Sequence, residues 1–282
     1  MKQLDLGALG GELLLFGGPY SNYQATQALK AQAEQLQIPP SNIICTGDIV
    51  AYCSQPNETI ELLREWGVHI VMGNCEESLG WNANDCGCGF EEGSACDTLS
   101  NDWYAFAVRH VKQIYKEWMR TLPSTIYFNF LGKRFAVLHG GVEQINQFIF
   151  PSTKTELKKQ QITGLGVDGV IGGHSGLPFT QIIDNKLWHN PGVIGMPAND
   201  GTNQTWYSRW QPREGNIKIK HCHLQYDASG AKQHMVESGL DNGYTNALMS
   251  GLWPSMDVLP ETERRQQGKT INEMEIIYHS PT

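Results

Sequence analysis

The feature that most constrains the fold is a pattern that repeats near the start of the chain: a short apolar run, a loop that contains glycine, and an amphipathic stretch. The apolar runs are residues 13–16, 43–45 and 70–72, and residues 25–36 and 57–66 between them carry apolar residues at helical spacing. Strands joined by helices in this way pair in parallel through right-handed crossovers. Because ligands of such sheets bind beyond the carboxyl ends of the strands, the loops after these runs are where we expect a functional site.

The second half of the chain is richer in strands. Residues 126–130 and 134–138 flank a Leu-Gly-Lys turn and are expected to form a hairpin. Further strands are expected at residues 169–171, 179–183, 187–188 and 217–224. One amphipathic helix is predicted over residues 102–120. The turn-rich segment 81–100 holds several cysteines and is interpreted as a lid or insertion loop.

Composition narrows the class of protein. With 282 residues, 40% of them apolar, the chain is long enough to bury the core of an enzyme-sized domain. A net charge of −8 and the lack of a basic run argue against nucleic acid as a partner. No apolar stretch approaches the ~18–20 residues of a membrane helix, so we expect no membrane association and a cytoplasmic location. Seven irregularly spaced cysteines favour reduced thiols or metal ligands over a disulfide framework.

Polar side chains follow four of the expected strands: Asp48, Asn74, His139 and His174. A carboxylate, an amide oxygen and two imidazoles form a mixed oxygen and nitrogen set, which suits Mn, Fe, Zn or Ni better than Ca or Mg. Taken singly, each has a simpler explanation, because Gly-Asp and Gly-Asn are common in turns and a lone histidine is usually a satisfied core residue. Their occurrence together and in this order favours a metal site.

Around these residues the chain resembles the calcineurin-like metallophosphoesterase superfamily, over residues 13–199. The matching pieces are Gly47-Asp48, Gly73-Asn74, His139-Gly140, Gly173-His174 and the run Asn-Pro-Gly-Val-Ile-Gly-Met-Pro at 190–197. That last run is similar to a motif of the family's small bacterial phosphodiesterase branch. The resemblance implies an α/β fold, a four-layer αββα sandwich of two mixed β-sheets flanked by helices. It also implies a dinuclear metal site at one edge of the sheets and hydrolysis of a phosphate ester.

The chain departs from the family pattern at one of the two metals. Gly18 stands where the Asp of the family's D-x-H motif is expected, Tyr20 where its His is expected, and Gly176 where the second His of G-H-x-H is expected. The resemblance assigns all three positions to the first metal, whereas the four ligands of the second metal are present. We therefore expect one divalent transition-metal ion and no organic cofactor. One ion can still polarise a phosphate and activate a water.

Asp48 and His139 are the expected catalytic residues, and Cys75 is a third candidate. Cys75 occupies the position of the His in the family's G-N-H-D/E motif, which often protonates the leaving group. A thiol with a pKa of about 8.5 is a poorer acid at neutral pH than an imidazolium. Cys75 can therefore serve as proton donor, as ligand, or in neither role.

Two further pairs of residues carry alternatives. Cys86 and Cys88 are candidate additional soft-metal ligands in a loop that folds over the vacated first-metal position, although small buried side chains are the simpler interpretation. Tyr20 and Asn22 are candidate substrate-binding residues at the start of a helix, where free backbone N–H groups attract anions. For Asn22 the role of helix N-cap is favoured.

The sequence thus predicts a metal-dependent phosphoesterase-type hydrolase that acts on a small phosphorylated substrate through a metal-activated water. Two alternatives stay open: a non-catalytic metal- or ligand-binding pseudo-phosphoesterase, and a thiol-metal redox protein. Residues 1–235 are expected to form the metallophosphoesterase-like domain, and residues 236–282 a C-terminal extension that is partly helical or mobile. An oligomer is compatible with the sequence.

Overall fold

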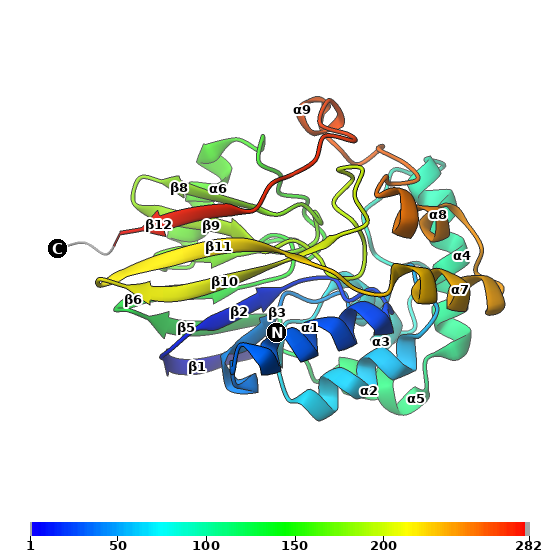
Figure 1. The fold of residues 1–282 in the computed structure, drawn as a ribbon, viewed down its shortest axis with the longest axis horizontal. Coiled ribbons are helices and arrows are strands. Elements are labelled where there is room, and N and C mark those ends of the chain that lie inside the picture. The colour runs from blue at the N-terminus through cyan, green and yellow to red at the C-terminus, as the bar shows by residue number, and fades with distance from the viewer. Residues whose placement is uncertain (1, 280–282) are drawn as a thin grey trace.

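The computed structural model describes residues 2–279, which form two six-stranded sheets with helices on their outer sides (Figure 1). Sheet A has the order β1 (Gln3–Leu9), β5 (Thr125–Phe130), β6 (Lys133–Val137), β7 (Gly169–Ile171), β9 (Lys186–Asn190) and β8 (Phe179–Ile183). Sheet B has the order β12 (Met274–Tyr278), β11 (Asn216–Leu224), β10 (Thr205–Arg213), β2 (Leu13–Phe16), β3 (Ile43–Cys45) and β4 (His69–Ile70). Both sheets mix parallel and antiparallel pairs.

The helices within the described residues are α1 (Tyr23–Gln35), α2 (Pro56–Trp66), α3 (Asn74–Trp81), α4 (Ala95–His110), α5 (Gln113–Met119), α6 (Thr155–Gly164), α7 (Ala228–Glu237), α8 (Gly243–Ser250) and α9 (Glu261–Arg264), with a short 3-10 turn at Pro40–Asn42. Helices α1, α2 and α7 pack beside sheet B, and α6 packs against sheet A. The αββα arrangement expected from the sequence is therefore confirmed. None of the helices in the described part of the chain combines the length and the apolar character required to cross a bilayer.

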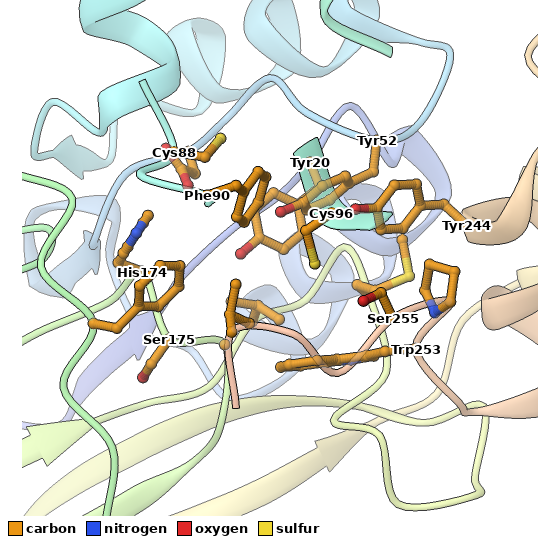
Figure 2. Close-up of a pocket in the computed structure, with 17 residues that line it drawn as sticks. Tyr20, Tyr52, Cys88, Phe90, Cys96, His174, Ser175, Tyr244, Trp253 and Ser255 are labelled. Atoms are coloured by element: carbon orange, nitrogen blue, oxygen red, sulfur yellow. The ribbon is translucent and has the colours of Figure 1, made fainter. Parts of the chain in front are cut away.

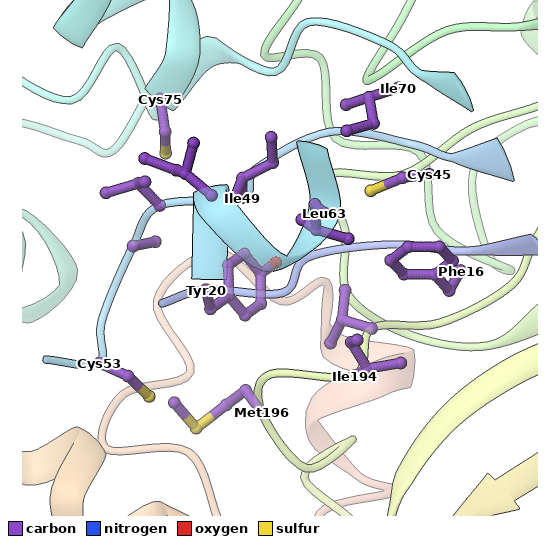
Figure 3. Packing of buried hydrophobic residues seen from close by; sticks show 14 of the residues in the cluster. Phe16, Tyr20, Cys45, Ile49, Cys53, Leu63, Ile70, Cys75, Ile194 and Met196 are labelled. Atoms are coloured by element: carbon purple, nitrogen blue, oxygen red, sulfur yellow. The ribbon is translucent and has the colours of Figure 1, made fainter. Parts of the chain in front are cut away.

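Strand β2 shows how the sequence places these layers. All four of its residues are fully buried. Leu13 and Leu15 belong to the core between the two sheets, whereas Leu14 and Phe16 belong to the core between sheet B and the helices. Figure 3 shows Phe16 in that second core with Leu63 of α2. Since successive strand side chains point to opposite faces, an apolar residue at every position requires cover on both sides.

The expected hairpin and the expected strands at 169–171, 179–183, 187–188 and 217–224 correspond to β5 to β9 and β11. The sequence patterns miss β1, β10 and β12. Strand β1 lies at the edge of sheet A and is largely exposed, so it lacks an apolar run. Strand β10 mixes polar residues with its buried tryptophans and includes a proline near its end.

The prediction of a single helix over residues 102–120 is wrong. The structure has two helices there, α4 and α5, and Val111 and Lys112 between them are in extended conformation. The side chain of Asn57 in α2 stabilises this break. Its amide donates to the His110 carbonyl at 2.9 Å, and its oxygen accepts from the Lys112 N–H at 3.1 Å. The loop expected over 81–100 is also shorter than predicted, since α4 already begins at Ala95.

The chain after residue 235 does not form a separate unit. The boundary expected at 235/236 falls inside α7. The following segment contributes α8 and α9, and β12 then pairs with β11 along sheet B. Tyr278 of β12 is 1% exposed and packs in the core between the sheets. The last strand therefore completes the sandwich.

A buried polar network links the two sheets. Thr180 of β8 hydrogen-bonds to His189 Nδ1 of β9 at 2.8 Å and to His221 Nε2 of β11 at 2.7 Å. His189 Nε2 in turn hydrogen-bonds to Ser208 of β10 at 2.7 Å. Both histidines are fully buried. Burial lowers the pKa of His221 to about 4 and holds the pKa of His189 well below its usual range.

This network predicts a loss of stability in mild acid. The unfolded chain binds a proton at His221 with a pKa of about 6.5, but the folded protein does so only near 4. The neutral network therefore stabilises the fold above about pH 6.5, and this contribution of up to about 3 kcal/mol is lost as the pH falls toward 4. Urea unfolding at a series of pH values should show that the free energy of unfolding of the His221→Gln protein declines less steeply with falling pH than that of the wild type. The exposed His234→Gln protein should keep the wild-type slope, and parallel profiles for all three would contradict the prediction.

Candidate metal centre

Four loops from the two sheets meet at one edge of the sandwich. Asp48 follows β3 and Asn74 follows β4, so both come from sheet B. His139 follows β6 and His174 follows β7, so both come from sheet A. The edge is formed by the carboxyl ends of parallel strands, which is where ligands of α/β sheets bind. The structure thus brings together the four residues that the sequence places after separate strands.

The ligand atoms of these residues converge on His139 Nε2. It lies 3.2 Å from Asp48 Oδ2, 3.0 Å from Asn74 Oδ1 and 3.1 Å from His174 Nδ1. Ligand atoms of Asp48, His139 and His174 all lie within 4.8 Å of one another. Asp48, Asn74 and His139 are each at most 4% exposed. The cluster is therefore compact and largely shielded from water.

The hydrogen bonds around the cluster orient its donor atoms toward one another. His139 Nδ1 lies 2.7 Å from the Thr46 carbonyl oxygen, which can only accept, so in the neutral ring the proton sits on Nδ1 and Nε2 carries a lone pair. The Asn74 amide nitrogen donates to the Cys86 carbonyl at 2.9 Å, which turns Oδ1 toward the cluster. The neutral ring therefore presents its Nε2 lone pair to oxygens of Asp48 and Asn74 in a buried space. Such an arrangement attracts positive charge, either a proton on Nε2 or a metal ion, and a transition-metal ion fits this donor set.

The pKa shifts in the cluster show that Asp48 favours positive charge at His139, either a second proton or a metal ion. Burial lowers the pKa of His139, but the Asp48 carboxylate outweighs burial and raises it above its usual value. Burial raises the pKa of Asp48, and His139 overcomes this effect and holds it below the usual value. Burial and the neighbouring His139 lower the pKa of His174 to about 3. His174 is thus a neutral imidazole, the form that binds metals, and within residues 2–279 its buried Nε2 has no hydrogen-bond partner.

Glu76 holds the two loops of sheet B in register, a role that the sequence patterns do not reveal. Its fully buried carboxylate accepts hydrogen bonds from the backbone N–H groups of Asp48 and Gly73 through Oε2, at 2.8 and 3.0 Å. Oε1 accepts from Ile49 and Val50 at 2.8 and 3.2 Å. Burial, assisted by the Asp48 charge, raises the pKa of Glu76 to about 7 against the effect of these donors. One carboxylate thereby positions both Asp48 and Asn74.

The ligand loops adopt backbone conformations that few side chains tolerate. Asp48 and His174 have φ angles of 57° and 56°, in the left-handed region. A Cβ atom on Gly73 would lie 2.3 Å from Asp48 Oδ1, and one on Gly173 would lie 2.5 Å from Thr46 Oγ1. Non-glycine residues with this geometry persist at sites where the surrounding structure enforces them. The glycines before Asn74 and His174 therefore permit the close approach of the loops.

Asn190 joins the 190–197 run to the loop of His174. Its amide nitrogen donates to the Gly173 carbonyl and to Ser175 Oγ, both at 2.9 Å. Its side-chain oxygen accepts from the Gly192 N–H at 2.9 Å. Asn190 is 1% exposed, so its side chain is fully committed to these contacts. The run therefore fixes the loop that carries a ligand.

Aromatic rings occupy the place where the first-metal ligands are missing. A Cβ atom on Gly18 would lie 2.4 Å from Tyr20 Cζ, so the Tyr20 ring excludes any side chain at position 18. At Gly176, whose φ is +72°, a Cβ atom would lie 3.4 Å from Trp253 Cζ2. Both rings line a cavity of about 60 Å³ that also reaches Asp48 and His174 (Figure 2). Its other aromatic lining residues are Tyr52, Phe90, Phe148 and Tyr244, none of which the sequence patterns indicate.

Cys75, the third expected catalytic residue, lies in the first turn of α3 and is 1% exposed. Its backbone N–H donates to Asp48 Oδ1 at 3.3 Å. Burial raises the pKa of its thiol well above the usual value, and the charge of Asp48 raises it further. The thiol is therefore protonated at neutral pH.

Cys86 and Cys88, the expected soft-metal ligands, form a disulfide beside the cluster. The Asn74 amide contacts this loop through the Cys86 carbonyl and lies 3.4 Å from Cys88 Sγ. A sulfur in a disulfide lacks the thiolate charge that binds metals, so the oxidised pair supports a ligand without being one. Metal binding by the reduced thiols stays a prediction.

The two expected substrate-binding residues have other contacts. Asn22 caps α1 by accepting from the Ala25 N–H at 3.1 Å, and its amide donates to the Gly195 carbonyl at 3.0 Å. It is 1% exposed. The N-cap role favoured by the sequence is the observed one. Tyr20 is 4% exposed and faces the cavity beside Asp48.

The contacts of Glu76 predict that its substitution lowers both the stability of the fold and the affinity for metal, by an amount that depends on the new side chain. Glu76→Gln replaces an acceptor oxygen by a donor and leaves buried N–H groups unpaired, and Glu76→Ala leaves all of them unpaired, at about 1–3 kcal/mol for each group. We expect the free energy of unfolding, measured with urea, to be highest for the wild type, lower for Glu76→Gln and lowest for Glu76→Ala. The affinity for Mn²⁺, measured by titration calorimetry, should follow the same order. The neighbouring Glu77 is exposed, so Glu77→Gln should change stability by less than about 0.5 kcal/mol. Wild-type affinity in Glu76→Ala would refute the positioning role.

Known proteins share both the sequence pattern and the fold. The model of the calcineurin-like phosphoesterase superfamily domain matches residues 21–207. An uncharacterised protein of Methanocaldococcus jannaschii is 27% identical over 254 residues, which covers 82% of this chain and 95% of that protein. A metallophosphoesterase from Sphaerobacter thermophilus has a TM-score of 0.67 at 17% identity, with 86% of this chain and 100% of that chain covered.

A hypothetical protein from Pyrococcus horikoshii has a TM-score of 0.71 at 15% identity, with 85% of this chain and 98% of that chain covered. These two structures share the sandwich of two mixed sheets. Asp48, Asn74, His139 and His174 all lie within the segment that the family model matches. The sequence pattern, the fold and the converging ligand loops agree: the chain belongs to the calcineurin-like phosphoesterase superfamily.

Proposed function

We propose that the protein hydrolyses a small phosphate ester at the site formed by Asp48, Asn74, His139 and His174, with one divalent transition-metal ion bound there. The observation that carries the proposal is the buried meeting of these four ligand atoms around His139 Nε2. Membership of a phosphoesterase superfamily gives the reaction class. The mixed donor set favours Mn, Fe, Zn or Ni.

The bound ion would supply a Lewis acid that polarises a phosphoryl oxygen and lowers the pKa of water. The chain's own residues prepare the site for this chemistry. The Thr46 carbonyl fixes the His139 tautomer, and Glu76 and Asn190 hold the ligand loops. The Cys75 thiol interacts with the Asp48 carboxylate, and burial with that charge raises its pKa, which makes it a poor proton donor to a leaving group at neutral pH.

A single ion is supported by the packing at the first-metal position. The Tyr20 ring takes the space beside Gly18, and burial raises the pKa of its phenol well above the usual value. A protonated phenol in an aromatic cavity is a poor replacement for a carboxylate and two imidazoles. The cavity therefore suits an apolar group better than a second cation.

Substitution of the ligands tests the proposal. We expect one equivalent of metal per chain by elemental analysis and metal-dependent hydrolysis of bis-p-nitrophenyl phosphate or p-nitrophenyl phosphate. Asp48→Asn replaces the charged carboxylate by a neutral amide and His174→Ala removes a ligand; since loss of supporting contacts alone costs about 10–100-fold, kcat/KM should fall at least about 100-fold in each. The exposed residues Asp241→Asn and His234→Ala are matched controls that should behave as wild type. Bound metal without hydrolysis of any ester would favour a non-catalytic binding protein.

The role of the cysteine pair is tested separately. If the reduced Cys86 and Cys88 thiols bind a soft metal, the reduced wild type should bind one more equivalent of Zn²⁺ than the Cys86→Ala, Cys88→Ala protein. Competition with a chromogenic zinc chelator measures this difference. The buried Cys53→Ala protein is the control, because the Cys53 thiol contacts the Gly195 carbonyl and is not part of the candidate metal-binding group. Equal zinc content in reduced wild type and double variant would exclude the pair as ligands.

A further inference from the structure

Two spaces of different character meet at the metal centre. The cavity of about 60 Å³ beside Asp48 and His174 has a mostly aromatic and aliphatic lining. A larger groove of about 840 Å³ has His139 in its lining, together with polar residues such as Gln144 and Asn146. Phe148 lines both spaces, and its ring lies 4.2 Å from the His174 ring.

This arrangement defines a substrate with two different arms. A phosphorus atom held at the ligand cluster would lie near both the cavity and the groove, because His174 lines the cavity, His139 lines the groove, and the two rings contact each other at 3.1 Å. One substituent would then enter the cavity and another would enter the groove. A monoester has only one carbon-bearing substituent and would leave one space without an occupant.

The charges of the site also favour a phosphodiester over a phosphomonoester as substrate. Within the described residues, neither the cavity nor the groove has a lysine or arginine in its lining. Asp48 contributes a carboxylate to the cavity, and Glu77 and Glu143 contribute two more to the groove. Without basic side chains, a divalent ion beside the Asp48 carboxylate leaves one net positive charge, which matches the single negative charge of a phosphodiester better than the two of a monoester.

The volume of the cavity limits its occupant. An engineered apolar cavity of about 150 Å³ holds a benzene molecule, so a cavity of less than half that volume holds roughly two or three carbon atoms. The rings that form its walls are mutually packed: the Tyr52 ring centroid lies 4.7 Å from that of Tyr20 and 4.3 Å from that of Tyr244. The cavity therefore fits a short alkyl group and excludes an aromatic ring.

We propose that the substrate is a phosphodiester with one short alkyl substituent, which binds in the cavity between Tyr20 and Trp253, and one larger, polar substituent, which binds in the groove along Gln144 and Asn146. The proposal rests on the phosphoesterase function above and specifies its substrate class. In the reaction, a water oxygen bonds to phosphorus while the bond from phosphorus to the larger alcohol's oxygen breaks. One water proton ends on the departing alkoxide, which leaves as the alcohol, the other passes to solvent, and the alkyl phosphate dianion is the second product.

A series of p-nitrophenyl alkyl phosphates with the Mn²⁺-loaded protein tests the proposal. The nitrophenyl ring exceeds the cavity, so the alkyl group occupies it and nitrophenol is released. Each methylene that enters the cavity should raise kcat/KM about fourfold, or about fifteenfold from methyl to propyl, and hexyl should bring no further gain. The methyl diester should also be hydrolysed more efficiently than p-nitrophenyl phosphate. Equal efficiency along the series, or preference for the monoester, would overturn the proposal.

A matched pair of methionine variants locates the effect. Met196 lines the cavity and is 4% exposed, so Met196→Ala enlarges it and should move the optimum from propyl toward hexyl. Met249 is 44% exposed and lies outside the cavity lining, so Met249→Ala should keep the wild-type profile. An unchanged optimum in a folded Met196→Ala protein would refute the assignment of the cavity.

A binding experiment separates this proposal from the proposed function. Calorimetric titration with dimethyl, ethyl methyl and methyl propyl phosphate measures affinity without turnover. Affinity that rises with chain length while no ester is hydrolysed would support the cavity assignment and refute the hydrolase. Metal-dependent hydrolysis of the methyl ester with affinity independent of chain length would refute the cavity assignment and leave the hydrolase intact.

Discussion

The constraint on which the site depends is the protonation of one imidazole. The Thr46 carbonyl accepts from His139 Nδ1, so Nε2 of the neutral ring presents a lone pair to Asp48 and Asn74. Donor atoms about 3 Å apart in a buried space are stabilised by a positive charge among them, either a proton or a metal ion. The folded chain therefore stabilises a cation-binding arrangement through backbone contacts outside the ligand set. A proton shared by His139 and Asp48 can serve in part, as the mutual shifts of their pKa values indicate.

The rest of the sandwich serves to bring these loops together. Each sheet contributes two of the ligands, and the core between the sheets fixes the distance that separates them. Glu76 then ties the loop of Asp48 to that of Asn74, and Asn190 ties the loop of His174 to the 190–197 run. These supporting residues are polar, buried and fully hydrogen-bonded, so loss of any one leaves several partners unpaired.

The fold and the four candidate ligands could be predicted where the sequence pattern is local. Apolar runs such as residues 13–16 and glycine-containing loops before Asp48 and His174 mark strand ends, and strand ends in parallel sheets share an edge. Strand β1 escapes prediction because an exposed edge strand has no apolar run. The break between α4 and α5 escapes it because the side chain of Asn57, far away in the sequence, pairs with the freed backbone groups. The aromatic cavity escapes it because its walls come from segments as distant as Tyr20, Phe148 and Trp253.

The missing first-metal ligands are parts of one packing change. The Tyr20 ring fits only because position 18 has no side chain, and Trp253 lies against the position where Gly176 lacks one. Trp253 is held there by its indole N–H, which donates to the Pro197 carbonyl at 2.6 Å in the run that also fixes the loop of His174. An Asp at position 18 would therefore require a smaller side chain at position 20. Since the Tyr20 ring depends on the absence of a side chain at position 18, the candidate metal ligands adjoin a cavity with a mostly aromatic and aliphatic lining, and the proposed single-ion site follows from that packing.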